Sequence, residues 1–165
     1  MTWTARLLPS FALCVALGMS AASAEDKIQF EHVLNIGSAG TGEGQFKYVE
    51  DFAFTKSGQL LATDAVHAWV QVFDKTSGKF ISRFGGKGEA DAQLDKPEGI
   101  AVDPDGRWMA VASESGPGGR PHVTVFGLED ALAAPNKYRQ PLSIDLRVNP
   151  LAVFATRGSL VVELS

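Results

Sequence analysis

Cysteine is nearly absent from this sequence, and the single Cys14 lies in a segment that we expect the mature protein to lose. An apolar run at residues 7–19 is followed by a small-x-small pattern, Ala-Ser-Ala, at residues 22–24. This pattern predicts a secretory signal peptide at residues 1–24. The run is shorter than the ~20 residues of a spanning helix, although an uncleaved anchor is the alternative. We therefore expect a periplasmic or secreted chain, residues 25–165, which has no disulfide and no transmembrane segment.

Several motifs of common enzyme classes are absent as well. The sequence contains no His-Glu-x-x-His zinc motif and no Gly-x-Ser-x-Gly nucleophile elbow. Its three histidines, His32, His67 and His122, are far apart, so a shared metal site is not expected. The formal net charge of −4 becomes −5 when the leader, with one base (Arg6) and no acid, is removed. This mild acidity argues against nucleic acid or an anionic membrane as the partner.

What the sequence does contain is a repeat. Glycine-rich loops, short alternating strands and tight turns fill residues 37–84, and most of the pattern returns 48 positions later. The matched positions are Gly37, Gly40, Gln45, Glu50, Ala53 and Gly58 with Gly85, Gly88, Gln93, Glu98, Ala101 and Gly106. Four antiparallel strands repeated at this period predict the blades of a β-propeller. A phosphate cradle is the alternative for the glycine loops, but no Gly-Lys-Ser/Thr and no helix follow them.

The repeat divides the chain into two blades and the beginning of a third. We expect blades at residues 38–84 and 86–146 and a partial blade at 148–165, with residues 28–36 as an edge or bulged strand before them. In the second blade, a short helix at 127–134 and a delayed outer strand at 142–146 replace the regular ending. Residues 149–154 align with residues 97–102, and residues 160–164 would form the next strand.

Three segments resemble the NHL repeat: PEGIAVD at residues 97–103, VQVFD at 70–74 and GEGQF at 42–46. The resemblance covers residues 30–126. It implies a ring of about six four-stranded blades, whose first strand often completes the last blade. It also implies an Asp after the second strand of a blade, which Asp64 matches and Ser113 does not. Members of this family are binding scaffolds, or resemble lactonases, peptide-amidating lyases or calcium-dependent propeller phytases.

Too few blades are present to close a ring. We therefore predict an all-β chain that forms a partial β-propeller, with about two to three four-stranded antiparallel blades, as a fragment of a six-bladed ring. A shortened member of a longer family is the favoured explanation. Self-association that completes the ring and an open twisted stack of sheets are the alternatives. An open arc would expose two blade faces, a predicted association surface.

Acidic side chains near strand ends are the candidate metal ligands. A propeller brings equivalent strand ends close to one axis, so Glu50, Asp51, Asp64 and Glu98 are the predicted set. Carboxylate oxygens suit Ca²⁺, the one cofactor that we consider, and a phosphoesterase would use it to polarise a phosphoryl oxygen. The alternative is that these carboxylates only cap turns and strand ends.

Basic side chains in or beside the glycine-rich connectors are the candidate ligand-binding residues. Lys47, Arg83, Lys87 and Lys96 could hold a small anion such as phosphate, or could be scattered solvated charges. The sequence thus predicts an exported propeller scaffold that binds a protein or a small anionic ligand. A calcium-dependent phosphoesterase that resembles propeller phytases is the alternative, and no catalytic residue is assigned.

Overall fold

The computed structural model describes residues 29–88, 93–116, 119–133, 142–157 and 159–164. The chain divides into two compact units, residues 1–32 and residues 33–165, and the second unit contains all the strands named here. The predicted signal peptide lies outside the described residues. Within the described part, no helix is both long and apolar enough to cross a membrane.

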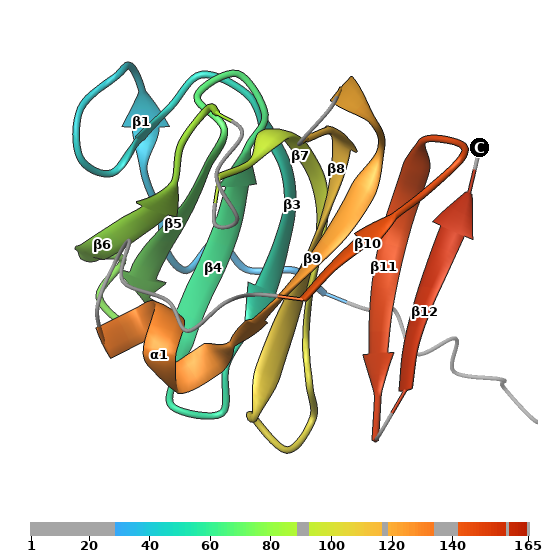
Figure 1. The fold of residues 1–165 in the computed structure, drawn as a ribbon. Coiled ribbons are helices and arrows are strands. Elements are labelled where there is room, and N and C mark those ends of the chain that lie inside the picture. The colour runs from blue at the N-terminus through green and yellow to red at the C-terminus, as the bar shows by residue number, and fades with distance from the viewer. Residues whose placement is uncertain (1–28, 89–92, 117–118, 134–141, 158, 165) are drawn as a thin grey trace, which may run out of the picture. The chain divides into compact units, whose positions relative to one another are not determined.

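The first blade is a regular four-stranded antiparallel sheet, as the sequence predicts (Figure 1). Its strands follow chain order: β3 (Val49–Phe54), β4 (Gln59–Asp64), β5 (Trp69–Asp74) and β6 (Phe80–Gly85). Tight turns join them, and Gly58 and Gly78 take φ values of 87° and 70° in those turns. Glycine is favoured there because a side chain strains this left-handed conformation.

The second blade has the same order with a longer ending. It consists of β7 (Asp95–Val102), β8 (Trp108–Ser115), β9 (His122–Gly127) and β10 (Leu142–Asp145). The helix α1 (Leu128–Ala133) separates β9 from β10, so the predicted helix and delayed outer strand are confirmed. Leu128 and Ala131 of α1 are buried, which explains why this short helix lies against the blade.

The third blade begins as the hairpin β11 (Pro150–Thr156) and β12 (Ser159–Leu164). Its register corrects the sequence alignment by one residue. The irregularity between Pro150 and Ala152 in this hairpin corresponds to the one between Pro97 and Gly99 in the second blade. Pro150, and not Asn149, therefore occupies the position of Pro97, and a one-residue slip exchanges the two faces of a strand.

The segment before the first blade is not the strand that the sequence predicts. Among the described residues 29–37, none lies in a strand. The chain instead packs over the turn at Gly78, where a Cβ would lie 3.1 Å from Leu34 Cδ2 and 3.4 Å from Ile36 Cγ1. The glycine loop that follows closes on itself through β1 (Ser38–Ala39) and β2 (Gln45–Phe46), a short parallel pair.

Two apolar clusters hold the sheets together. Each sheet has two faces. We call the face that lies toward the preceding blade, or that would do so in blade 1, the leading face, and the opposite face the trailing face. The first cluster joins the trailing face of blade 1 (Leu61, Val70, Val72, Phe84) to the leading face of blade 2 (Ile100, Met109, Val111, Phe126). The second joins the trailing face of blade 2 (Ala101, Ala110, Ala112, Val123) to Val153 of the hairpin.

Candidate functional site

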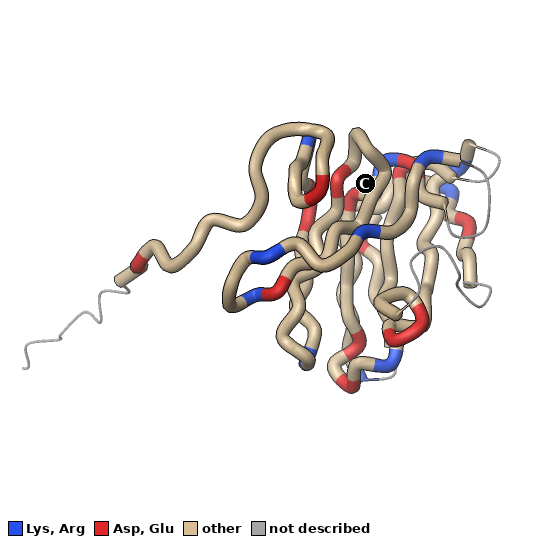
Figure 2. Tube along the Cα trace, turned by 90° about the vertical axis from the view of Figure 1, so that its left-hand side faces the viewer, with Lys and Arg blue, Asp and Glu red and all other residues tan. Residues whose placement is uncertain are grey.

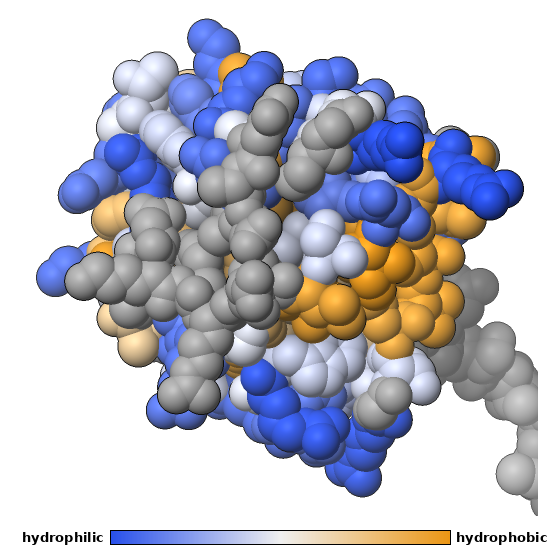
Figure 3. Space-filling model, viewed as in Figure 1, coloured by the Kyte–Doolittle hydropathy of each residue, from blue (hydrophilic) through white to orange (hydrophobic). Residues whose placement is uncertain are grey.

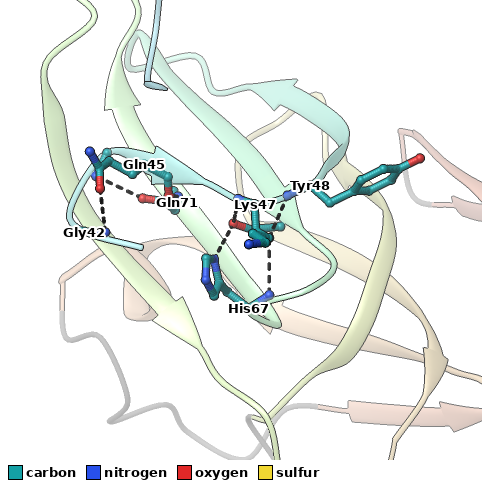
Figure 4. Close-up of polar contacts among 8 residues, drawn as sticks. Gly42, Gln45, Lys47, Tyr48, His67 and Gln71 are labelled. Atoms are coloured by element: carbon teal, nitrogen blue, oxygen red, sulfur yellow. Dashed lines mark hydrogen bonds and ion pairs between the residues drawn. The ribbon is translucent and has the colours of Figure 1, made fainter. Parts of the chain in front are cut away.

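One buried carboxylate fixes the corner of blade 1 where β4 ends. Asp64 is 0% exposed and accepts hydrogen bonds from the backbone N–H groups of Lys47 (2.9 Å), Tyr48 (3.3 Å) and His67 (3.2 Å). The Nδ1 atom of His67 lies 2.8 Å from Asp64 Oδ2 and donates to it (Figure 4). Burial raises the pKa of Asp64, but these hydrogen bonds outweigh burial and lower it below its ordinary value. This charge therefore pins the connector and the following loop to one place.

The equivalent corner of blade 2 lacks that network. Ser113 stands opposite His122 as Asp64 stands opposite Trp69, yet its buried Oγ has no hydrogen-bond partner. The ring of His122 is buried as well, and burial lowers the pKa of this histidine, although a backbone hydrogen bond with Arg120 opposes the shift. Here the acid comes from the connector instead: Asp95 accepts a 2.5 Å bond from Ser115 Oγ.

The glycine-rich connectors have a structural role that explains their repetition. A Cβ on Gly40 would collide with the side chain of Gln45, and one on Gly88 would collide with Gln93. In blade 1, Gln71 completes the arrangement: its Nε2 donates to the Gln45 carbonyl (2.6 Å) and its Oε1 accepts from Gly44 N (3.1 Å) (Figure 4). The matched glycine–glutamine pairs are therefore packing units within the connectors.

A hollow of about 460 Å³ lies where the connectors and loops of blades 1 and 2 meet. Its lining combines carboxylates, ammonium groups and an apolar rim: Tyr48, Glu50, Ala65, Val66, Lys87, Asp95, Lys96, Glu98 and Glu114. Figure 2 shows acidic and basic positions close together at the upper end of the sheets. Tyr48 and Val66 are 58% and 59% exposed and stand open to a ligand. This hollow is the candidate site.

The charges in the hollow are unevenly paired. Lys96 Nζ lies 2.6 Å from Glu114 Oε2, and Lys87 Nζ lies 3.6 Å from Asp95 Oδ1. Among the described residues, no ion pair within 4.0 Å involves Glu50 or Glu98. Burial first, and then the carboxylates of Glu50 and Glu114, raise the pKa of Glu98 above its ordinary value. The hollow therefore has an excess of negative charge that a cationic group would relieve.

The structure brings four of the eight predicted site residues to this hollow: Glu50, Glu98, Lys87 and Lys96. Asp51 is used in the fold, because its Oδ2 accepts from Ile100 N of the next blade at 2.9 Å. Asp64 is likewise occupied by backbone donors. Within the described ranges, no three His, Cys, Asp or Glu side chains converge on a metal position. The calcium hypothesis thus depends on Glu50 and Glu98.

The other two predicted basic residues lie elsewhere. Arg83 places its guanidinium carbon 3.7 Å from the ring centroid of Trp69, a cation–π contact, and His67 stacks on the same ring at 4.5 Å. Lys47 contributes its backbone N–H to Asp64, and its side chain does not line the hollow. Of the four candidate basic residues, Lys87 and Lys96 therefore line the hollow, and Lys47 and Arg83 do not.

Sequence reasoning missed Tyr48, Val66, Asp95 and Glu114 as lining residues. Asp95 and Lys96 belong to an extension of β7 that pairs Asp95 with Ser115, and this pairing brings Glu114 beside Lys96. The adjacent residues Asp95 and Lys96 are visible in the sequence of the connector. Their closeness to Glu114 on β8 follows from the register of the two strands and not from the repeat. Lys96 has φ of 49°, an uncommon conformation for a residue with a side chain.

Comparison with solved structures decides the architecture. The β-propeller domain of Cps50 (Swd1) from Myceliophteria thermophila matches with a TM-score of 0.55 and 12% identity, over 81% of this chain and 36% of that one. The chain is a partial β-propeller. Hydrazine synthase from Kuenenia stuttgartiensis also matches, with a TM-score of 0.47 and 23% identity over 64% of this chain and 26% of its own. No protein-family model and no curated protein sequence matches the chain.

A third match is dihydro-heme d1 dehydrogenase NirN, with a TM-score of 0.49 and 17% identity over 68% of this chain and 22% of that one. The chain spans 22% to 36% of the length of these three structures. At these identities the likeness shows the fold alone. Function has to be argued from the hollow between the first two blades of this partial propeller.

Proposed function

We propose that this chain is an exported propeller scaffold of the NHL type that binds a protein partner at the hollow between blades 1 and 2. The observation that carries the proposal is the uneven charge pairing there. Lys87 and Lys96 are each engaged by a carboxylate, whereas Glu50 and Glu98 face the same space without a cation. A small anion finds no unengaged cation among the described lining residues, so the occupant is a basic side chain of the partner.

The rim of the hollow supports a protein partner over a free cation. Tyr48 and Val66 are more than half exposed beside the carboxylates and offer apolar contact to the stem of a lysine or arginine. Aromatic side chains are enriched in protein interfaces for this combination of apolar body and polar tip. Glu50 and Glu98 would hold the charged group, and Tyr48 would pack along the stem.

Binding of a lysine-rich peptide tests this proposal, with a glutamate-rich peptide of equal length as the opposite probe. We expect the lysine peptide to bind the purified protein, with a dissociation constant that rises at least tenfold when both Glu50→Gln and Glu98→Gln are present. Glu129→Gln on α1, outside the hollow, is the matched control and should bind as the wild type does. Equal binding of both peptides, or no effect of the double substitution, would overturn the proposal.

A calcium-dependent phosphoesterase is the second candidate, because the same two glutamates offer hard oxygen ligands. Asp51 and Asp64 do not join them, since both carboxylates accept backbone hydrogen bonds. If Ca²⁺ raises the melting temperature and phosphate is released from an inositol phosphate, this function gains support. The absence of both responses would exclude it, and persistence of both in the Glu50→Gln, Glu98→Gln variant would show that other residues are responsible.

A further inference from the structure

Two apolar faces of this partial propeller have no neighbour within the described chain. The leading face of blade 1 exposes Val49, Phe52 and Phe54 by 47%, 59% and 55%. It also carries an apolar hollow of about 220 Å³, lined by Ile36, Phe46, Val49, Phe52, Phe54, Leu60 and Ala62. At the other end of the sequence, the trailing face of the β11–β12 hairpin exposes Phe154 by 53% and Val161 by 50%.

The repeat identifies what each face is built to contact. Phe52 and Phe54 occupy the positions that Ile100 and Val102 occupy in blade 2, because Phe52 pairs with Ala62 as Ile100 pairs with Val111. Ile100 belongs to the cluster that packs on the trailing face of blade 1, and Val102 packs against that cluster. The leading face of blade 1 is therefore shaped to receive the trailing face of another blade.

The hairpin supplies the other half of such an interface. Phe154 pairs with Val161 as Ala101 pairs with Ala110 in blade 2. Ala101 and Ala110 are 6% and 0% exposed, because the next sheet covers them. The exposed trailing face of the hairpin is thus shaped to receive a leading face. Its larger side chains match the apolar hollow on blade 1, which has room for an aromatic ring.

We propose that a second copy of this chain is the occupant, with the leading face of blade 1 in one copy on the trailing face of the hairpin in the other. The same chain carries both complementary surfaces, and the contact would repeat a type of junction that the fold already makes twice internally. Because the two surfaces differ, the contact is heterologous: it closes into a ring if the rotation between copies allows, and otherwise continues as a filament.

A separate apolar surface lies on the other side of the hairpin, toward blade 2. A groove of about 470 Å³ lies between blade 2 and the hairpin, lined by Trp108, Val125, Leu142, Ile144 and Leu160 among others. Figure 3 shows apolar atoms gathered over the part of the molecule that contains β10 and the β11–β12 hairpin. Leu142 and Ile144 are 62% and 41% exposed there. Contiguous apolar surface of this kind marks an association site in a water-soluble fold.

Two charge substitutions and their mixture test the head-to-tail arrangement. Phe52→Glu removes one surface and Val161→Glu removes the other, and both side chains are at least half exposed, so neither substitution should unfold the protein. We expect the wild type to associate with increasing concentration in sedimentation velocity, and each variant alone to sediment as one chain. An equimolar mixture of the two variants should form a one-to-one dimer, because each retains the surface that the other lacks.

The control is Ile81→Glu. Ile81 lies at the bulge of the outer strand β6, and its side chain is 48% exposed, close to the exposure of Phe52 and Val161. It should associate as the wild type does. Far-UV circular dichroism and urea midpoints of all variants check that each is folded. A wild type that stays a single chain at every concentration would overturn the proposal. So would a mixture in which the variants do not combine, or a Val161→Glu variant that associates like the wild type, which indicates a symmetric contact between two copies of the blade 1 face.

Discussion

Blade 1 and blade 2 are built on the same repeat, but they satisfy their buried polar groups differently. At the end of the second strand, blade 1 has Asp64, whose carboxylate accepts hydrogen bonds from three backbone N–H groups and from the ring of His67. Blade 2 places Ser113 there, opposite His122, and the buried Oγ of Ser113 has no hydrogen-bond partner. The comparison teaches that the acid at this position is a structural clamp, and that blade 2 closes its corner by other means.

The two junctions between sheets differ in the same way. Asp51 of blade 1 reaches across to Ile100 N with a 2.9 Å hydrogen bond. The equivalent residue in blade 2 is Gly99, where a Cβ would lie only 3.3 Å from Val153 N of the hairpin. A hydrogen bond from a side chain to the backbone therefore joins blade 1 to blade 2, whereas the backbones of blade 2 and the hairpin pack directly against each other.

The largest expected effect is the loss of the Asp64 clamp. Asp64→Ala leaves three backbone donors and the His67 ring unpaired in a buried corner, so we expect it to lower the free energy of unfolding by about 3–5 kcal/mol. Ser113→Ala, at the equivalent position, should change the free energy by less than about 0.5 kcal/mol, because its Oγ bonds to nothing. Urea denaturation measures both, and equal losses in the two variants would contradict the difference between the blades.

The junctions come next. Asp51→Ala removes a charge-assisted bond to Ile100 N and should cost about 1.5–3 kcal/mol. Gly99→Ala forces a methyl group against the backbone of Val153 and should cost about 1–3 kcal/mol through overpacking. Tryptic cleavage sites identify which junction opens in each variant. Opening of the same sites in both would show that the two junctions are not separate.

Removal of the buried imidazole should have a smaller, stabilising effect. His122→Leu replaces a buried polar ring, which has no side-chain hydrogen bond among the described residues, with apolar atoms, so the free energy of unfolding should rise by about 1 kcal/mol. Trp69→Leu at the equivalent position of blade 1 is the comparison, and it should destabilise, because Trp69 carries the contacts with Arg83 and His67. A shift in the urea midpoint of the opposite sign at His122 would mean that its ring is satisfied.

The pH dependence of stability separates the two corners. Burial lowers the pKa of His122 from its ordinary value near 6.5, even though a backbone hydrogen bond with Arg120 and the charges of Asp145 and Asp95 oppose this. Below this pH, His122 binds a proton in the unfolded chain but not in the folded chain. Its contribution to stability is therefore full above about pH 6.5 and falls as the pH decreases below that value. The pKa of Asp64 is lowered from 3.8, so this carboxylate also makes stability fall with decreasing pH, but only below about pH 3.8. His122→Leu should flatten the loss between pH 7 and 5, measured by urea midpoints.

Much of the fold could be predicted because the repeat is written in residues with strict backbone requirements. Gly58 and Gly106 both adopt positive φ at equivalent turns, and Gly40 and Gly88 both pack under a glutamine, so a 48-residue comparison found real structural equivalences. The helix that the sequence predicts at residues 127–134 is present as α1 at Leu128–Ala133. The register of the hairpin was predicted one residue off, because the equivalence of Pro150 with Pro97 follows from the pairing of the strands and not from the residue pattern.

The candidate site could be predicted in part for a similar reason. Glu50 and Glu98 occupy matched positions of neighbouring blades, and the fold does bring both to one hollow. The sequence could not show that Asp51 would turn to Ile100 N, or that Lys96 would find Glu114, because both pairs join segments across the register of separate strands. Distances between such partners are set by tertiary packing, which a linear pattern does not contain.

Amide hydrogen exchange at the blade 1 corner tests most directly the claim that Asp64 is the clamp that blade 2 lacks. NMR of the purified wild type and of Asp64→Ala would follow the backbone amides of Lys47, Tyr48 and His67, which all donate to this carboxylate. The account predicts slow exchange of all three in the wild type, faster exchange by at least tenfold in the variant, and no comparable change in β8 and β9. Fast exchange of these amides in the wild type, or unchanged protection in the variant, would contradict it.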